Sequence, residues 1–272
     1  MSETKKLPIS VHVLTLNSAK TLERTLRSVQ ICEEILVVDG GSTDATLDIA
    51  KKYGARIVLQ HPDNAGGKPI DDFSAVRNLA LREATQPWIF SLDSDEYASE
   101  ELCAELQDAS HDRAAAYYVP RKYILADGRI VDFATTYPNE RLYFFHRDTV
   151  EQWVKPVHER PQLRTGTGTK HFRGASLAPI GVLQEYKEKN LRYLRIEAKK
   201  SAGKGWGHWF AHRVLHTVRS RCIAFVKLLL IWLLPHRGTR LPLRHELVRF
   251  WYGWKLIVET CPLHSRRVLT NR

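Results

Sequence analysis

Short apolar runs and amphipathic segments alternate along the first part of the chain. Four apolar runs have the length and the Val, Ile and Leu content of buried strands, and they lie at residues 9–15, 34–39, 56–60 and 88–92. The segments between them repeat apolar side chains at helical spacing, which predicts helices at residues 18–30, 45–53 and 71–84. Alternating strands and helices favour an α/β fold with a Rossmann-like, mostly parallel sheet.

The pattern changes after residue 110. Two apolar segments, 115–125 and 129–133, flank Ala126-Asp127-Gly128, which is a typical hairpin turn sequence. Residues 141–145 form a further apolar run. These segments predict a mixed extension of the sheet that closes over the first half.

From residue 185 onward the chain has the pattern of helices, at 185–202 and 206–234. The second helix ends in the apolar stretch 222–234, which is 13 residues long and contains Lys227. A transmembrane helix needs about 20 apolar residues, so this stretch favours a helix in the membrane interface. The expected interfacial anchors are Trp206, Trp209, Trp232, Trp251 and Trp254. A helical cap packed on the core is the alternative. We therefore expect a domain at 1–184 and an amphipathic helical extension at 185–272.

Charge is distributed unevenly over the 272 residues, whose net charge is +11. Residues 160–272 hold 23 Lys and Arg against 5 Asp and Glu, whereas residues 1–159 hold 18 against 25. Such asymmetry indicates contact with nucleic acid or with an anionic membrane. The Leu, Ile and Trp content of the basic part favours the membrane, and the sequence contains no nucleic-acid motif.

The cysteines and the N-terminal residues indicate the compartment. The four cysteines lie far apart and form no CxxC pair, which argues against a zinc site or a disulfide framework. The first ten residues are polar and lack the apolar region of a secretory signal. These features suit a reducing compartment, and the family resemblance described below implies a cytoplasmic protein that is peripheral on the inner membrane.

An acidic cluster follows the apolar run at 88–92. Asp93, Asp95 and Glu96 place three carboxylates within four positions. Packed carboxylates repel one another unless positive charge lies among them. In parallel sheets ligands bind at the carboxyl ends of the strands, where Asn17 and Asp39 also fall. A divalent cation held by Asp93 and Asp95 would satisfy this chemistry, and the start of a helix near Ser99 is the simpler alternative.

Four motifs together resemble a known family. They are Leu14-Thr15-Leu16-Asn17, VVDGGSTDAT at 37–46, FSAVRN at 73–78 and FSLDSDE at 90–96. In this order, over about residues 8–160, they resemble the inverting family 2 glycosyltransferases with the GT-A nucleotide-diphospho-sugar transferase fold. The VHE element at 157–159 and the basic, aromatic tail are similar to those of bacterial lipopolysaccharide core glycosyltransferases of the beta-1,4-glucosyltransferase type. Ser18-Ala19-Lys20 departs from the family, in which many members have an acidic residue after the Asn.

The resemblance implies roles on the donor side. Asp95 would bind Mg²⁺ or Mn²⁺, and Asp93 would reach the ribose or the metal. Asp39 would accept a hydrogen bond from the base, typically uracil, beside Gly40, whose lack of a side chain allows tight backbone geometry. Two further residues, Thr15 and Asn17, would border the nucleotide. Arg77 would contact the diphosphate or fix Asp93. The simpler alternatives are a turn at Asp39, a surface ion pair at Arg77 and a helix-capping role for Glu96.

On the acceptor side, inversion requires a base that takes the proton of the attacking hydroxyl. Glu159 is the candidate base, and His158 would position the acceptor. Both could instead hold a loop over the donor, and Asp132 and Glu140 remain open as bases.

The resemblance thus implies a metal-dependent transfer of a hexose, glucose from UDP-glucose, onto a lipid-linked saccharide such as the lipopolysaccharide core. Two other classes stay open. A nucleotidyltransferase would usually carry a Gly-rich loop with Lys or Arg after the first strand, and Leu16-Asn17-Ser18-Ala19 is not such a loop. A basic nucleic-acid-binding protein would fit the charge alone.

Overall fold

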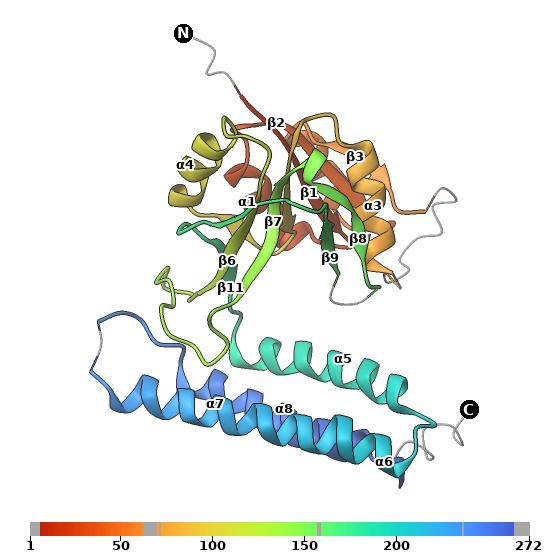
Figure 1. Cartoon of the computed structure of the whole chain (residues 1–272), viewed down its shortest axis with the longest axis vertical. Helices are drawn as coiled ribbons and strands as arrows, with labels where there is room; N and C mark the ends of the chain where they lie inside the picture. Colours follow the sequence, from red (N-terminus) through yellow and green to blue (C-terminus); the bar gives the residue numbers. More distant parts are fainter. Residues whose placement is uncertain (1–5, 62–69, 71, 157–158, 236, 264–272) are drawn as a thin grey trace. The chain divides into compact units, whose positions relative to one another are not determined.

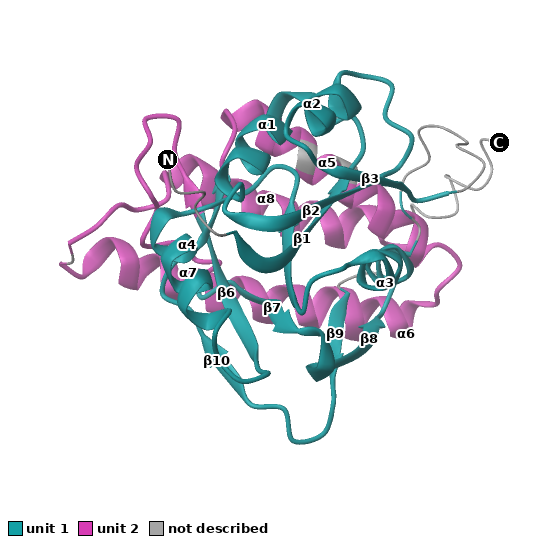
Figure 2. Ribbon diagram, turned by 90° about the horizontal axis from the view of Figure 1, so that it is seen from above, with its two compact units in different colours: residues 1–122, 138–178 teal, residues 123–137, 179–272 magenta. Residues whose placement is uncertain are grey.

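The computed structural model describes residues 6–61, 70, 72–156, 159–235 and 237–263. The chain packs into two compact units, whose elements are labelled in Figure 1 and which are coloured separately in Figure 2. The first, the sheet unit, comprises residues 1–122 and 138–178, and the second, the helical unit, comprises residues 123–137 and 179–272. The pattern along the chain did not predict that 123–137 would pack with the helices.

The described residues of the sheet unit contain a large mixed sheet in the order β3-β2-β1-β4-β7-β6-β11-β5, with β10 paired to β6. Four neighbouring strands run parallel: β1 (Leu7–Thr15), β2 (Cys32–Asp39), β3 (Arg56–Leu59) and β4 (Trp88–Asp93). Strand β7 is antiparallel to β4 and to β6. The other strands of this sheet are β5 (Tyr97–Ala98), β6 (Ala116–Ile124), β7 (Glu140–His146), β10 (Thr169–His171) and β11 (Ser176–Pro179).

Helices cover both faces of the parallel strands, because successive side chains of a strand point to opposite faces. In β2, Ile35 and Val37 join the larger core, and Leu36 and Val38 join a second core. The larger core lies beneath α1 (Ala19–Ser28), α2 (Thr46–Lys52) and α4 (Glu100–Ala109). The second core lies beneath α3 (Phe73–Glu83). The expected α/β architecture is therefore confirmed.

A separate hairpin follows β7. The short 3₁₀ helix η1 (Arg147–Thr149) leads into β8 (Val150–Val154), which pairs antiparallel with β9 (Arg160–Leu163). This hairpin contacts α3 through β8, and Glu159 directly precedes β9.

The predicted strand at 129–133 is wrong. The turn at Ala126-Asp127-Gly128 forms, but within the described residues its second arm makes only single bridges, Ile124 to Ile130 and Phe133 to Arg240. The backbone N–H groups of Asp132 and Phe133 both donate to the carbonyl of Thr239. The N–H of Val131 still donates to the carbonyl of Tyr123 across the turn, but the next two N–H groups bond to a loop of the helical unit, so the pairing stops after one bridge.

The helical unit is built from α5 (Leu183–Ser201), α6 (Trp206–Trp209), the π-helical segment η2 (Phe210–Leu215), α7 (His216–Leu233) and α8 (Leu243–Glu259). Helices α7 and α8 approach closely at Gly253, where an added Cβ would lie 2.9 Å from Cδ of Arg221. On α8, Glu246 is buried and accepts hydrogen bonds from the backbone N–H and the hydroxyl of Thr135. In the described part of the chain, none of the helices combines the length and apolarity that a membrane crossing requires.

Candidate active site

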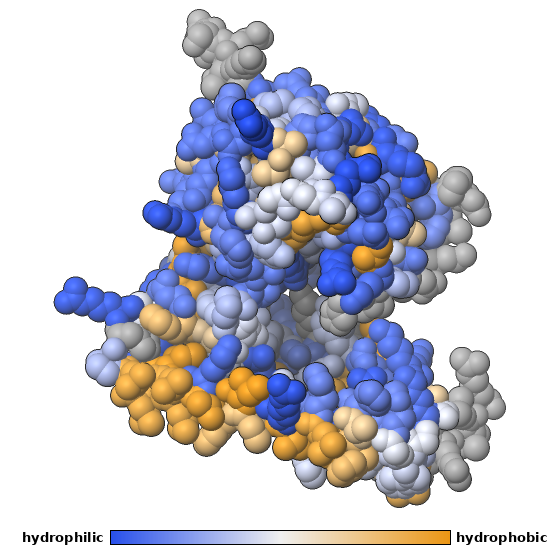
Figure 3. Space-filling model, in the orientation of Figure 1, coloured by the Kyte–Doolittle hydropathy of each residue, from blue (hydrophilic) through white to orange (hydrophobic). Residues whose placement is uncertain are grey.

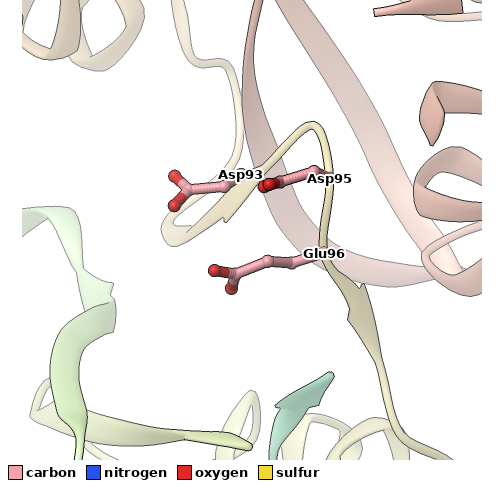
Figure 4. Close-up of side chains that lie close together, drawn as sticks. All are labelled: Asp93, Asp95 and Glu96. Atoms are coloured by element: carbon pink, nitrogen blue, oxygen red, sulfur yellow. The ribbon is translucent and has the colours of Figure 1, made fainter. Parts of the chain in front are cut away.

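The acidic cluster lies on the turn between β4 and β5. Asp93 ends β4, and Asp95 and Glu96 follow in the turn. One carboxylate oxygen from each lies within 4.8 Å of the others. Figure 4 shows the three side chains pointing to the same side of the turn. The hydroxyl of Thr25 on α1 donates to the carbonyls of Ser94 (3.1 Å) and Glu96 (2.6 Å), so the helix below holds the turn in this conformation.

Arginines supply the positive charge that the cluster requires. Asp93 accepts hydrogen bonds from Nη2 of Arg77 (3.1 Å) and from Nη1 of Arg141 (2.6 Å). Glu96, which is almost fully buried, accepts a hydrogen bond from Nε of Arg121. Charge-assisted hydrogen bonds of this kind offset the repulsion between the carboxylates.

The pKa values of two neighbouring acids, Asp93 and Glu96, shift in opposite directions. Burial acts to raise the pKa of Asp93, but the charges of Arg141 and Arg77 outweigh it and hold that pKa at about 2. Burial raises the pKa of Glu96, and the charge of Asp93 acts in the same direction. Asp93 is therefore an anion at neutral pH, as a residue that holds a cation or a sugar hydroxyl must be.

Arg77 connects the cluster to Glu159. Its side chain is 2% exposed and lies over the rings of Tyr143 and Trp153, at 5.2 and 5.4 Å from their centroids. Its Nε lies 3.6 Å from Oε1 of Glu159. Arg77 is thus buried and fixes Asp93, which is one of the two roles expected for it, and the surface ion pair is wrong.

Asn78, the neighbour of Arg77, fastens the β8 hairpin to α3. Its side-chain amide donates to the carbonyl of Trp153 (2.9 Å) and accepts from the N–H of Trp153 (2.7 Å). The N–H of Phe73 also donates to the carbonyl of Pro156 (3.0 Å). These contacts fasten the hairpin beside which Glu159 lies, and His158 lies outside the described residues.

The carboxyl ends of β1 and β2 form a second polar group. Asp39 is fully buried, and its carboxylate accepts hydrogen bonds from Thr15, from the N–H of Gly41 and from Ser42. The N–H of Gly40 donates to the carbonyl of Thr15 (2.9 Å). Asp39 therefore builds the Gly40-Gly41 turn, and its present hydrogen bonds lie within the protein.

Asn17 adopts a left-handed backbone with φ +50°. Its side-chain oxygen accepts a hydrogen bond from the N–H of Thr43 (2.9 Å), which joins the loop after β1 to the loop after β2. The segment Ser18-Ala19-Lys20, which departs from the family, contacts the loop after β2 and the turn after β4. Asp44 accepts a hydrogen bond from the N–H of Ala19 (3.1 Å), and the hydroxyl of Ser18 lies 3.0 Å from that of Ser94.

The two other candidate bases are engaged elsewhere. Glu140 begins β7 and lies 2.8 Å from Nδ1 of His171. Asp132 belongs to the helical unit, where it accepts a hydrogen bond from the N–H of Thr239 (2.9 Å).

Sequence reasoning missed Arg121 and Arg141 as site residues. Each is a cation in an otherwise apolar strand, Arg121 in AYYVPRKYI and Arg141 in ERLYFFH. The acidic cluster's need for positive charge was a signal for such residues, but their pairing depends on strands distant in sequence.

The oxygen donors of the turn fit a hard divalent cation. Mg²⁺ and Mn²⁺ prefer carboxylate, phosphate and water oxygens, and a site with one or two carboxylates is common where phosphates complete the shell. Four carboxylates, including Glu159, face three arginines here. The nearly balanced charge would favour a cation most strongly once an anionic diphosphate is bound.

Comparison with known sequences identifies the family. A sequence model of glycosyl transferase family 2 matches residues 10–162, more than half of the chain. The chain belongs to this family, and together with the sheet topology this confirms the GT-A α/β fold. The membership also decides between the classes that the sequence left open in favour of a glycosyltransferase.

Individual relatives are similar over part or most of the chain. The lipopolysaccharide core biosynthesis glycosyltransferase LpsC of Rhizobium meliloti (strain 1021) is 28% identical over 209 residues, which are 74% of each chain. An uncharacterized glycosyltransferase of Rickettsia bellii (strain RML369-C) is 34% identical over 44% of this chain and 40% of its own. The crystal structure of S. aureus TarS 1-349 in complex with UDP is 15% identical with a TM-score of 0.45, and the match covers 97% of this chain and 92% of that one.

Proposed function

We propose that this protein transfers a hexose, glucose from UDP-glucose, with inversion onto a lipid-linked saccharide such as the lipopolysaccharide core. The observation that carries the proposal is the carboxylate turn of Asp93, Asp95 and Glu96 at the carboxyl end of β4, neutralised by arginines. The similarity to LpsC over 74% of each chain supports the lipopolysaccharide acceptor.

The donor is bound by the carboxyl ends of β1, β2 and β4. Asp95 is the principal ligand of a Mg²⁺ or Mn²⁺ ion, and Asp93 holds the ribose or completes the metal shell. When bound, the ion stabilises the negative charge that develops on the leaving diphosphate. The end of β1 and the loop after it border the nucleotide through Thr15 and Asn17. Asp39 gives up one of its internal hydrogen bonds and accepts one from the base instead.

The transfer is a single displacement at the anomeric carbon. The acceptor oxygen forms its bond to that carbon from the face opposite the diphosphate, and the bond from the carbon to the diphosphate oxygen breaks. Glu159 takes the proton of the acceptor hydroxyl, and His158 positions the acceptor. Arg77 orients Glu159 and Asp93 toward the same space, which supports this assignment of the base.

The helical unit places the enzyme on the cytoplasmic surface of the inner membrane. Figure 3 shows apolar side chains gathered over its helices. Large apolar residues at least 40% exposed on α6 to α8 include Trp206, Phe225, Leu229, Leu230, Trp232, Leu233 and Trp254. Apolar area of this kind beside many Lys and Arg residues fits an anionic lipid surface and supports a lipid-linked acceptor.

Nucleotide release from a panel of sugar nucleotides tests the proposal. We expect UDP release from UDP-glucose in the presence of Mn²⁺ or Mg²⁺ and none with chelator. Asp95→Asn should lower the rate by about 100-fold or more, because the leaving diphosphate loses its metal-mediated stabilisation. Asp108→Asn, at an exposed aspartate of α4, is the matched control and should retain the wild-type rate.

Adding purified, deacylated lipopolysaccharide core should raise the rate above that of donor hydrolysis. UDP release that persists unchanged in chelator would remove the metal from the mechanism. Release only from another sugar nucleotide would correct the donor, and full activity of Asp95→Asn would remove the turn from the site.

A further inference from the structure

The helical unit contains a cavity of about 410 Å³ between α7, α8 and the segment that carries Thr135. Its polar wall consists of Thr135, His216, Arg219, Ser220 and Arg249, and the two arginines are its cations. Among the residues that line it there is no carboxylate. This composition attracts an anion with several acceptor oxygens.

The carboxylate of Glu246, which contacts Thr135 and Arg249, does not neutralise the cavity. Glu246 is buried, and Thr135 donates to both of its oxygens. Nη1 of Arg249 donates to the hydroxyl oxygen of Thr135 and lies 3.7 Å from Oε2 of Glu246, so this arginine is partly compensated. Arg219 is exposed, and within the described chain no carboxylate forms an ion pair with it. The cavity therefore keeps an excess of positive charge.

The apolar wall continues out of the cavity along α7. Ile223 lines the cavity, and it is four residues after Arg219 on the same face of the helix. Val226 and Leu230 follow on this stripe, and the three apolar side chains are 51%, 55% and 51% exposed. At a rise of about 1.5 Å per residue, the stripe from Ile223 to Leu230 is about 10 Å long and ends about 16 Å from Arg219 along the helix.

We propose that this cavity binds the phosphate group of a membrane lipid, with an acyl chain lying along Ile223, Val226 and Leu230. The charges of Arg219 and Arg249 bind the phosphate. The apolar stripe binds an acyl chain, so the expected ligand is an amphiphile rather than a free anion. The stripe is continuous with the exposed apolar residues of α7, such as Leu229 and Leu233. The inference rests on the membrane association proposed above and adds a defined headgroup site to it.

Calorimetric titration of the full chain with a water-soluble lipid tests the site without a membrane or a donor. The probes are dihexanoyl phosphatidic acid, dihexanoyl phosphatidylcholine and inorganic phosphate. We expect phosphatidic acid to bind about tenfold or more tightly than either of the others, because only it combines an uncompensated phosphate with chains. Arg219→Gln should weaken its binding by about tenfold.

Two further variants distinguish binding in the cavity from attraction to the positive charge of the protein as a whole. Arg244→Gln removes the same charge from an exposed position of α8 outside the cavity, and it should change the affinity by less than about twofold. Val226→Ser should weaken the binding of phosphatidic acid and leave that of inorganic phosphate unchanged. Equal losses in Arg219→Gln and Arg244→Gln would overturn the site, and equal affinity for inorganic phosphate would overturn its assignment to a lipid. Because these titrations contain no sugar nucleotide, their outcome is independent of whether the enzyme releases UDP.

Discussion

Arg77 is the residue that joins the two sides of the proposed active site. A buried guanidinium is costly unless it is paired, and Arg77 lies between Asp93 and Glu159 and over two aromatic rings. The distance of 3.6 Å to Glu159 is that of an ion pair rather than a hydrogen bond. Arg77 thus contacts both Asp93 and Glu159, which supports the proposal that the two acids act in one site.

Glu159→Gln tests the base directly. Glutamine keeps the size of the side chain but cannot take a proton, so kcat should fall by about 100-fold or more. The dissociation constant of UDP should stay near the wild-type value, because the variant leaves Asp93 and Asp95 intact. Steady-state kinetics and a UDP titration separate the two effects.

The matched control is Glu151→Gln, at an exposed glutamate of the same hairpin. It should change neither kcat nor UDP affinity. If Glu159→Gln turns over as fast as the wild type, the proton goes to another group.

His12 is a buried titratable residue in the middle of the sheet. It lies on β1 opposite Ser91 of β4, and among the described residues neither of its ring nitrogens has a hydrogen-bond partner. Burial lowers the pKa of His12 to about 3, with the charge of Arg77 as the next cause. The other contributing charges are smaller, and they belong to Glu34, Arg147 and Arg56.

The lowered pKa of His12 makes stability depend on pH. The unfolded chain binds a proton at His12 below about pH 6.5, whereas the folded chain does not until about pH 3. The stability that this group contributes is therefore complete above pH 6.5 and is lost as the pH falls toward 3. His12→Leu removes this titration. Between pH 7 and pH 5 the wild type should lose about 2 kcal/mol more free energy of unfolding than the variant.

Urea denaturation of both proteins at several pH values measures this difference. The slope against pH decides the outcome, so a general change in the stability of the variant does not affect it. Parallel curves for the two proteins would mean that His12 is protonated in the folded state.

At this scale, the sequence predicted the acids better than their partners. Asp93 and Asp95 could be assigned because a strand ends at them and a motif surrounds them. Arg121 and Arg141 could not, because their positions opposite the turn depend on the pairing of β6 and β7, which are distant in sequence from it.

At the scale of elements, the contact between α3 and β8 positions Glu159. Asn78 satisfies both the N–H and the carbonyl of Trp153, so it replaces a missing strand partner for the hairpin. The adjacent residue of α3 is Arg77, and one helical turn thus holds both Asp93 and the hairpin.

Asn78→Ala should remove both hydrogen bonds and leave two backbone groups of Trp153 without them. We expect a loss of about 1–3 kcal/mol in the free energy of unfolding. Because the hairpin then moves relative to Arg77, kcat should fall more than the affinity for UDP. Urea denaturation and steady-state kinetics measure the two effects.

Arg82→Ala, at an exposed position of the same helix, is the control and should leave both quantities unchanged. A variant at Asn78 that loses stability but keeps kcat would limit the contact to a structural role.

The prediction of elements succeeded where local periodicity decides the structure. The four parallel strands and the helices between them follow their apolar patterns, because each buries a regular face against the same core. Residues 129–133 were also predicted as a strand, yet the N–H groups of Asp132 and Phe133 bond to Thr239, more than a hundred positions away. No local pattern contains that partner.

At the scale of the whole molecule, charge and apolar surface are concentrated in the same part of the chain. Residues 160–272 carry 23 of the 41 Lys and Arg residues, and most of the large exposed apolar side chains belong to the helical unit. The residue pattern predicted both features, but not that residues 123–137 would join this unit. Charge brings a protein to an anionic surface, and apolar side chains keep it there.

These two contributions can be separated with vesicles of phosphatidylcholine and phosphatidylglycerol. Leu229→Ser/Leu233→Ser should reduce vesicle binding by about tenfold or more, since two exposed leucines no longer enter the lipid. Ile31→Ser/Val182→Ser changes two similarly exposed apolar residues outside α6 to α8, and it should bind as the wild type does. Raising the salt concentration should weaken the binding of all three proteins, because it screens the Lys and Arg residues. Binding that depends on salt but not on Leu229 and Leu233 would mean that the enzyme meets the membrane through charge alone.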